Sequence, residues 1–369
     1  MSTGLDRGMR WGGILAALSF AGCMVAQSSG IAAQGPQGTQ TAGSGATVAD
    51  AATTDAETMK SLRHSIDTGH AADALKRIEA LRAQHSKMPG LSRVEGLAEY
   101  AQSELKLADA AFAAALVEDP NDVESSQMRG LTLFRLGRPG DAIPLLEFAS
   151  SKGGLGKADP NYILALCYMD TRRYDDARHA FAAQFGFAGD SAEAYLVAAR
   201  MLLRREYLPI AQSYAQKATE LEPALPLAHE VLGEIALASN HLDEAIAEFE
   251  KEKAHNPLEG AIYDRLGDTY GRAARYDDAQ RSLQEAILLE PNSTGPYILL
   301  GKTMLKKGDP IAAVTYLGRA EQMDPANYIT HSLLGQAYRA MGRTEDAARE
   351  TVTAQRLQTA SEPKLENVH

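Results

Sequence analysis

Residues 260–293 read GAIYDRLGDTYGRAARYDDAQRSLQEAILLEPNS, and the spacing of apolar and small residues in this stretch decides the fold. Two segments show the 3.6-residue periodicity of amphipathic helices, and a short break separates them. The positions that return elsewhere in the chain are Leu266, Gly267, Tyr270, Ala279, Leu283, Ala286 and Pro291. The stretch therefore predicts a pair of helices joined by a tight turn.

The same pattern returns every 34 residues along most of the chain. Its clearest marker is an alanine at one phase of the period. The nine alanines are Ala74, Ala108, Ala142, Ala177, Ala211, Ala245, Ala279, Ala313 and Ala347. All intervals are 34 residues except the one from Ala142 to Ala177, which is 35. A fixed period of this length indicates a repeat array, in which each unit buries its apolar face by stacking on its neighbours.

Local signals agree with helix pairs. Glycine or asparagine stands at the break within several units, where the left-handed backbone of a helix end is often needed. These residues are Gly69, Gly137, Asn240, Gly308 and Gly342. Proline follows the second helix of several units. The first and last units depart most from the pattern, and we interpret them as caps whose outer faces meet water.

The recurring spacing of Leu-Gly, Tyr, Ala, Phe, Ala and Pro resembles the tetratricopeptide repeat. This resemblance implies an all-α fold, a right-handed α-solenoid of about nine helix-turn-helix repeats in residues 55–361. We place the repeats at 55–88, 89–122, 123–156, 158–191, 192–225, 226–259, 260–293, 294–327 and 328–361, followed by a C-terminal tail at 362–369. The array leaves no room for a second globular domain, so we expect function to reside on its surface.

The N-terminal residues have the composition of an export signal. A short charged start precedes the apolar run Trp11–Val25, which is shorter than the ~20 residues that cross a bilayer. We therefore predict a signal peptide or lipoprotein signal at 1–33, with an uncleaved anchor as the alternative. Residues 34–54 are rich in Gly, Ser, Thr, Ala and Gln, which is typical of a flexible low-complexity linker.

The segment Phe20-Ala21-Gly22-Cys23 resembles a bacterial lipobox, in which small residues precede a cysteine that becomes lipidated. This resemblance implies a membrane tether through Cys23. The alternative is cleavage after Ala26 or Ala33, which discards Cys23. We expect an exported protein, located in the periplasm, anchored as a lipoprotein or secreted.

Composition and motifs speak against several functions. The net charge of −11 disfavours nucleic-acid binding, which requires a basic face. His229-Glu230 lacks the second histidine of a zinc protease motif, and residues 152–157 lack the spacing of a phosphate loop. His229 and His331 occupy a place where other repeats carry tyrosine, so we interpret both as packing residues. We predict no catalytic residues, no metal site and no cofactor.

In this family the first helix of each repeat lines a concave groove at fixed positions. Carrying those positions over predicts an apolar set, an acidic set and a polar-to-basic set. The apolar set is Leu97, Tyr100, Leu131, Phe134, Tyr162, Leu166, Met169 and Leu196. The acidic set is Glu230, Glu234, Asp264 and Asp268, and the third set is Lys302, Lys306, Gln336 and Arg339. The alternative is that the apolar residues pack against one another and the acidic residues form a solvated face.

From these sets we expect a non-catalytic, monomeric scaffold or adaptor that binds a peptide or protein partner in the groove, within the cell envelope. Apolar anchors accept large side chains, and carboxylates accept Lys or Arg. An accessory subunit of an envelope enzyme, or of a pilus or secretion assembly complex, is the alternative. End-to-end self-assembly is disfavoured because the terminal repeats are polar.

Overall fold

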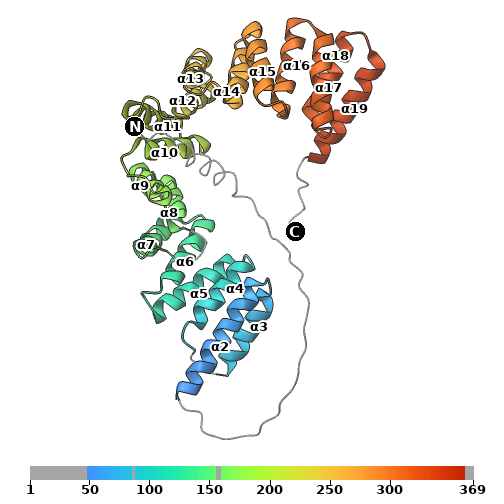
Figure 1. The fold of residues 1–369 in the computed structure, drawn as a ribbon. Coiled ribbons are helices and arrows are strands. Elements are labelled where there is room, and N and C mark those ends of the chain that lie inside the picture. Colours follow the sequence, from blue (N-terminus) through green and yellow to red (C-terminus); the bar gives the residue numbers. More distant parts are fainter. Residues whose placement is uncertain (1–47, 85–87, 155–158, 362–369) are drawn as a thin grey trace. The chain divides into compact units, whose positions relative to one another are not determined.

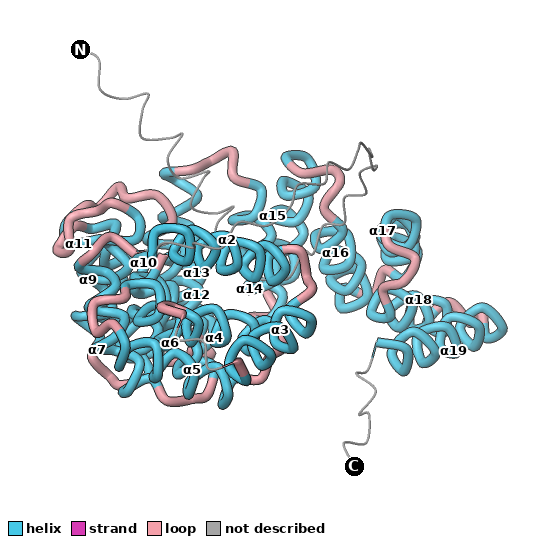
Figure 2. Tube along the Cα trace, turned by 90° about the horizontal axis from the view of Figure 1, so that it is seen from below, coloured by secondary structure: helices cyan, strands magenta, loops and turns pink. Residues whose placement is uncertain are grey.

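The computed structural model describes residues 48–84, 88–154 and 159–361. These residues form 18 helices, and no strand occurs among them. In Figure 2 short pink loops join one helix to the next throughout the described chain. Helices pack side by side in consecutive pairs, and the all-α prediction of about nine helix-turn-helix repeats is confirmed.

The chain divides into two compact units after Gly186 (Figure 1). The helices of the first unit are α2 Val48–Asp67, α3 Ala71–Ala83, α4 Leu91–Ala101, α5 Leu105–Glu118, α6 Val123–Arg135, α7 Pro139–Ser151, α8 Pro160–Asp170 and α9 Tyr174–Phe185. Those of the second unit are α10 Ala192–Arg204, α11 Leu208–Leu221, α12 Ala228–Ala238, α13 Leu242–His255, α14 Gly260–Arg272, α15 Tyr276–Leu289, α16 Thr294–Lys307, α17 Pro310–Met323, α18 Tyr328–Ala340 and α19 Thr344–Ser361.

The phased alanines lie where the two helices of a repeat touch. All nine are buried, with exposed fractions between 0% and 3%. A side chain larger than a methyl group at these places would force the helices apart, because protein cores are close-packed. The 34-residue period is thus the sequence record of one helix contact that recurs in each repeat.

The glycine of each Leu-Gly pair lets a large side chain from the second helix cover the first. A Cβ at Gly96 would lie 2.6 Å from the Phe112 ring, and a Cβ at Gly233 would lie 2.5 Å from the Phe249 ring. Both phenylalanines are 0% exposed. In the last repeat Gly335 faces Thr351, at 3.1 Å, in place of a large apolar residue. The pairing of α18 with α19 is therefore less apolar than that of the inner repeats.

An arginine that precedes the second helix secures several of the turns. Arg275 lies over the Tyr270 ring, 4.6 Å from its centroid, and its Nε donates a hydrogen bond of 2.9 Å to Asp278. The stacked cation and the ion pair hold the end of α14 against the start of α15. The same arrangement recurs with Arg173 on Tyr168 and with Arg343 on Tyr338.

The turns use left-handed backbone, as the sequence predicts at Asn240 and Gly308, whose φ angles are +60° and +80°. Four repeats place a residue that is neither glycine nor asparagine in this conformation. These residues are Ser103, Arg172, Glu206 and Ala274. The sequence gave no sign of them, because the helix pair dictates this backbone whichever residue stands there.

The N-terminal predictions lie largely outside the described residues. Residues 1–47, which include Cys23 and the predicted signal, are not described. Helix α2 begins at Val48, inside the segment 34–54 that composition assigns to a linker. Of the helices in the described residues, none has both the length and the apolar character needed to cross a membrane.

Candidate partner-binding surface

The predicted apolar set of the first unit lies on α4, α6 and α8, the first helices of three consecutive repeats. Five of its side chains are half-buried and keep part of their surface open to water. They are Leu97, Tyr100, Leu131, Phe134 and Tyr162. The Arg135 guanidinium covers the Tyr100 ring at 4.8 Å from its centroid. These residues form a row of large side chains at matching places, and we call it the apolar row.

The other apolar predictions are buried. Leu166 is 8% exposed, Met169 is 0% exposed and Leu196, in the second unit, is 3% exposed. Such side chains offer little or no surface to a partner, which favours mutual packing for these three. Tyr162 also has a structural contact, because its ring lies edge-on to buried Phe181 at a centroid distance of 5.9 Å.

The acidic set of the second unit is largely neutralised by arginines. Glu230 on α12 is 6% exposed, and its Oε1 lies 3.1 Å from Arg265 Nε and 3.6 Å from Arg200 Nη2. Burial raises the pKa of Glu230, and the charges of Arg200 and Arg265 oppose that rise. Glu234 also pairs with Arg265. Because these arginines come from neighbouring repeats, the ion pairs link α10, α12 and α14.

Sequence reasoning missed Arg200 and Arg265. Neither residue belongs to the groove positions that carry a negative charge, and no spacing rule joins them to Glu230. Arg200 does stand 34 residues before Glu234, so the period alone places it on the matching face of the preceding repeat. That alignment is the one signal that could have identified it as a partner.

Asp264 on α14 differs from the other acids. Its Oδ1 is buried and has no hydrogen-bond partner, and no ion pair of the described residues includes it. Burial raises the pKa of Asp264 to about 6; Arg265 opposes this, while Asp268 and Glu290 add to it. A carboxyl group held this way is costly unless a donor reaches it.

Gly295 leaves room beside the Asp264 carboxyl group. A Cβ at residue 295, at the start of α16, would lie 3.7 Å from Asp264 Oδ2. Gly295 itself is exposed, so the approach is bordered by backbone rather than by a side chain. The Asp264 carboxyl group is therefore the member of the acidic set best placed to accept a hydrogen bond from outside the chain.

Asp268 and the polar-to-basic set border two hollows. Asp268 pairs with Arg272 at 3.3 Å and, with Lys302 and Lys306, lines a hollow of about 50 Å³ between α14 and α16. Gln336 and Arg339 line a larger hollow of about 510 Å³ on α18 and α19. Its other lining residues are Tyr328, Ser332, Thr351, Ala354, Gln355 and Gln358. The α19 side of this hollow was absent from the predicted groove, which considered first helices alone.

Comparison with known proteins places this arrangement in a family. One model of the tetratricopeptide repeat matches residues 63–123, 128–191 and 298–357, about half of the chain, and a second matches 261–293. No curated protein sequence gives a significant match. Among solved structures, MamA from Desulfovibrio magneticus RS-1 is 20% identical, with a TM-score of 0.45, over 47% of this chain and 98% of that chain.

YrrB, described as a TPR protein with an unusual peptide-binding site, is 22% identical with a TM-score of 0.43, over 50% of this chain and 95% of that chain. Similarity at this level carries no argument about ligands. The family rests instead on the matched repeats, the buried alanine phase and the recurring glycine contacts. On these grounds the chain belongs to the tetratricopeptide repeat family.

Proposed function

We propose that this protein is a non-catalytic scaffold that binds a peptide or protein partner along the first helices of its repeats. The observation that carries the proposal is the apolar row on α4, α6 and α8. Three consecutive repeats place large, partly exposed side chains at the same positions, although this surface could have been polar. Clusters of this kind on a soluble protein mark interaction sites.

The Asp264 carboxyl group supports the same proposal in the second unit. Its unsatisfied Oδ1 and the space beside Gly295 suit a donor such as a lysine, an arginine or a backbone N–H of a partner. The neighbouring carboxylates already have arginine partners, so they set the local field rather than wait for a ligand. We therefore assign separate roles to the two units, with apolar anchoring in the first and polar anchoring in the second.

A test needs a partner of known sequence. Peptides selected from a displayed random library against the purified chain would be chemically cross-linked to it, and the linked residues would be mapped by mass spectrometry. The proposal expects links on α4, α6 and α8 or beside Asp264. Links confined to the second helices, such as the surface around Val117, which is 84% exposed, would contradict it.

We also propose that the protein acts in the cell envelope, attached through a lipidated Cys23. Support comes from the order of charged, apolar and small residues in 1–33 and from the lipobox-like segment that ends at Cys23. Mass spectrometry of the mature N-terminus tests this. An acylated start at Cys23 agrees with the proposal, whereas an unmodified start at residue 27 or 34 overturns the tether.

A further inference from the structure

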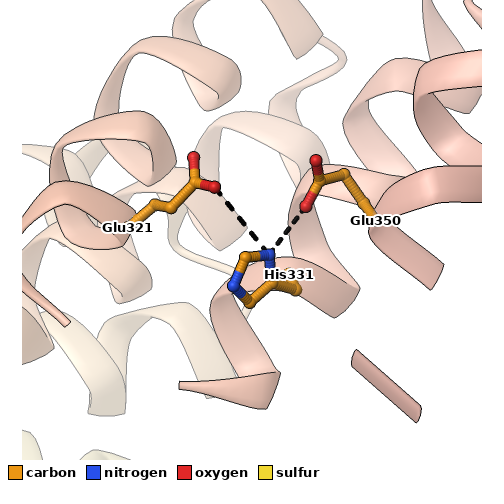
Figure 3. A group of neighbouring side chains, drawn as sticks. All are labelled: Glu321, His331 and Glu350. Atoms are coloured by element: carbon orange, nitrogen blue, oxygen red, sulfur yellow. Dashed lines mark hydrogen bonds and ion pairs between the residues drawn. The ribbon is translucent and has the colours of Figure 1, made fainter. Parts of the chain in front are cut away.

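One histidine lies between two carboxylates at the last junction between repeats. Figure 3 shows His331 of α18 facing Glu321 of α17 and Glu350 of α19. His331 Nδ1 lies 2.7 Å from Glu350 Oε2 and 4.0 Å from Glu321 Oε1. The three possible ligand atoms all lie within 4.8 Å of one another. Three consecutive helices thus contribute one donor atom each to a single point.

The other ring nitrogen fixes the tautomer of His331. Its Nε2 lies 3.0 Å from the carbonyl oxygen of Pro325, which can only accept a hydrogen bond. Nε2 therefore carries a proton, and a neutral ring then directs the Nδ1 lone pair toward the two carboxylates. Histidines that ligate metals are oriented in this way, with the second ring nitrogen donating to a backbone carbonyl.

The charges at this junction favour a divalent cation. Among the described residues, no lysine or arginine forms an ion pair with Glu321 or Glu350. A protonated His331 would balance one of the two carboxylates, whereas a divalent ion with neutral His331 balances both. The side chains of His331 and Glu350 are 6% and 17% exposed, so these charges are poorly screened by water.

The geometry leaves room for adjustment and access. Zn²⁺ with nitrogen and oxygen ligands at about 2.0–2.2 Å in a tetrahedral arrangement separates the ligand atoms by roughly 3.4 Å. Glu350 would therefore withdraw slightly and Glu321 would approach. The Glu321 side chain is 41% exposed, so it can move, and an ion can arrive from its side with a water in the fourth position.

The chain contains a matched site that lacks the second carboxylate. His229 and Glu248 occupy the same places three repeats earlier, and His229 Nδ1 also lies 2.7 Å from Glu248 Oε2. There Thr219 stands at the position of Glu321, and Lys251 Nζ binds Glu248 at 2.7 Å. The His–Glu pair alone is thus a packing arrangement between the helices of one repeat. The added Glu321 and the missing lysine distinguish the C-terminal site.

We propose that Glu321, His331 and Glu350 bind one divalent transition-metal ion, with Zn²⁺ favoured by the ligand set, which holds the last helix pair to α17. One imidazole and two carboxylates suit Zn²⁺ better than Mg²⁺ or Ca²⁺, which prefer all-oxygen sites of higher coordination number. The role is structural, because α18 and α19 have a neighbouring repeat on one side among the described residues and a comparatively polar contact at Thr351.

Calorimetric titration of the chelator-treated full chain with Zn²⁺ at pH 7.5 tests the site. We expect Glu321→Gln to remove one equivalent of bound ion or to weaken it at least about 10-fold, while His229→Gln binds as the wild type does. Glu321→Gln changes an exposed carboxylate to its isostere, so folding is retained, and circular dichroism checks this. Zn²⁺ should also raise the melting temperature of the wild type more than that of Glu321→Gln.

Two results would overturn the site. One is a wild-type chain that binds no Zn²⁺ tighter than about 1 mM. The other is identical stoichiometry and affinity in the wild type, Glu321→Gln and Glu350→Gln. Mg²⁺ and Ca²⁺ serve as comparison ions, and binding of these with equal affinity would contradict the assignment to a transition metal. None of these outcomes depends on the partner-binding surface, so the two proposals stand or fall separately.

Discussion

The ring of Phe249 lies directly over Gly233, so that a Cβ at residue 233 would come within 2.5 Å of it. This contact joins α12 to α13, and its counterpart joins Gly96 of α4 to Phe112 of α5. The Leu-Gly element of the repeat is therefore a packing requirement. Glycine stands there because the second helix places a large side chain where a Cβ would otherwise be.

Gly233→Ala should lower the free energy of unfolding by about 1–3 kcal/mol, because the Phe249 ring is fully buried and has to shift. Chemical denaturation followed by circular dichroism measures this. Gly318→Ala is the control, since residue 318 lies inside α17 with no atom within 4 Å of its added Cβ. The control should be neutral or gain up to about 1 kcal/mol from helix propensity. Equal losses in both variants would contradict the packing account.

Ala274→Gly should stabilise the second unit. Ala274 has a φ of +56°, and an L-residue with a side chain pays about 1 kcal/mol for left-handed backbone that glycine adopts freely. Gly308→Ala, at the corresponding turn one repeat later with a φ of +80°, should lose a similar amount. Thermal melts of both variants test the pair. A destabilised Ala274→Gly would show that the side chain makes a contact which outweighs its backbone cost.

Arg265→Ala should destabilise the chain by about 1–3 kcal/mol, because it leaves Glu230 buried with Arg200 as its remaining partner in the described structure. Arg272→Ala is the matched control on the same helix. Arg272 pairs with Asp268 at i,i+4, with both side chains partly exposed, so its loss should cost less than about 0.5 kcal/mol. Urea midpoints compare the two, and a reversed order would contradict the role assigned to Arg265.

Asp264→Asn should alter how stability depends on pH. The folded chain holds the Asp264 proton more tightly than the unfolded chain, because the folded pKa is about 6 against an ordinary 3.8. The contribution of this group to the free energy of unfolding is therefore largest below about pH 4 and falls as the pH rises toward 6. The variant should exceed the wild type by about 1 kcal/mol above pH 6, since partial exposure screens the charge. A difference that stays constant from pH 4 to 7 would count against it.

Much of the fold could be predicted from the sequence, because each repeat encodes its own helix pair. Ala279 and Gly267 mark a contact within one repeat, and the short distance between them along the chain makes it visible as spacing. The left-handed backbone at Gly308 is visible for the same reason. These features need no knowledge of how one repeat is rotated against the next.

The candidate surface was harder to predict because it depends on that rotation. Position rules treated Met169 and Tyr100 alike, yet the first is fully buried and the second is half-exposed. The pairing of Glu230 with Arg265, and the meeting of Glu321 with His331, join side chains from neighbouring repeats. The division after Gly186 also left no mark beyond an irregular turn at residues 184–190.

The apolar row gives the most direct test of the central claim that first helices carry partner binding. Tyr100→Ala with Phe134→Ala is a better choice than a change at Tyr162, whose ring packs on Phe181. Val117→Ala, on the second helix α5 of the same unit, is the control.

The decisive measurement is the affinity of a library-selected peptide for these variants, by fluorescence anisotropy, alongside their melting temperatures. We predict at least a 10-fold loss of affinity, about 1.4 kcal/mol or more, for the double variant with little change in melting temperature and none for Val117→Ala. Unchanged peptide affinity in the double variant would contradict the claim.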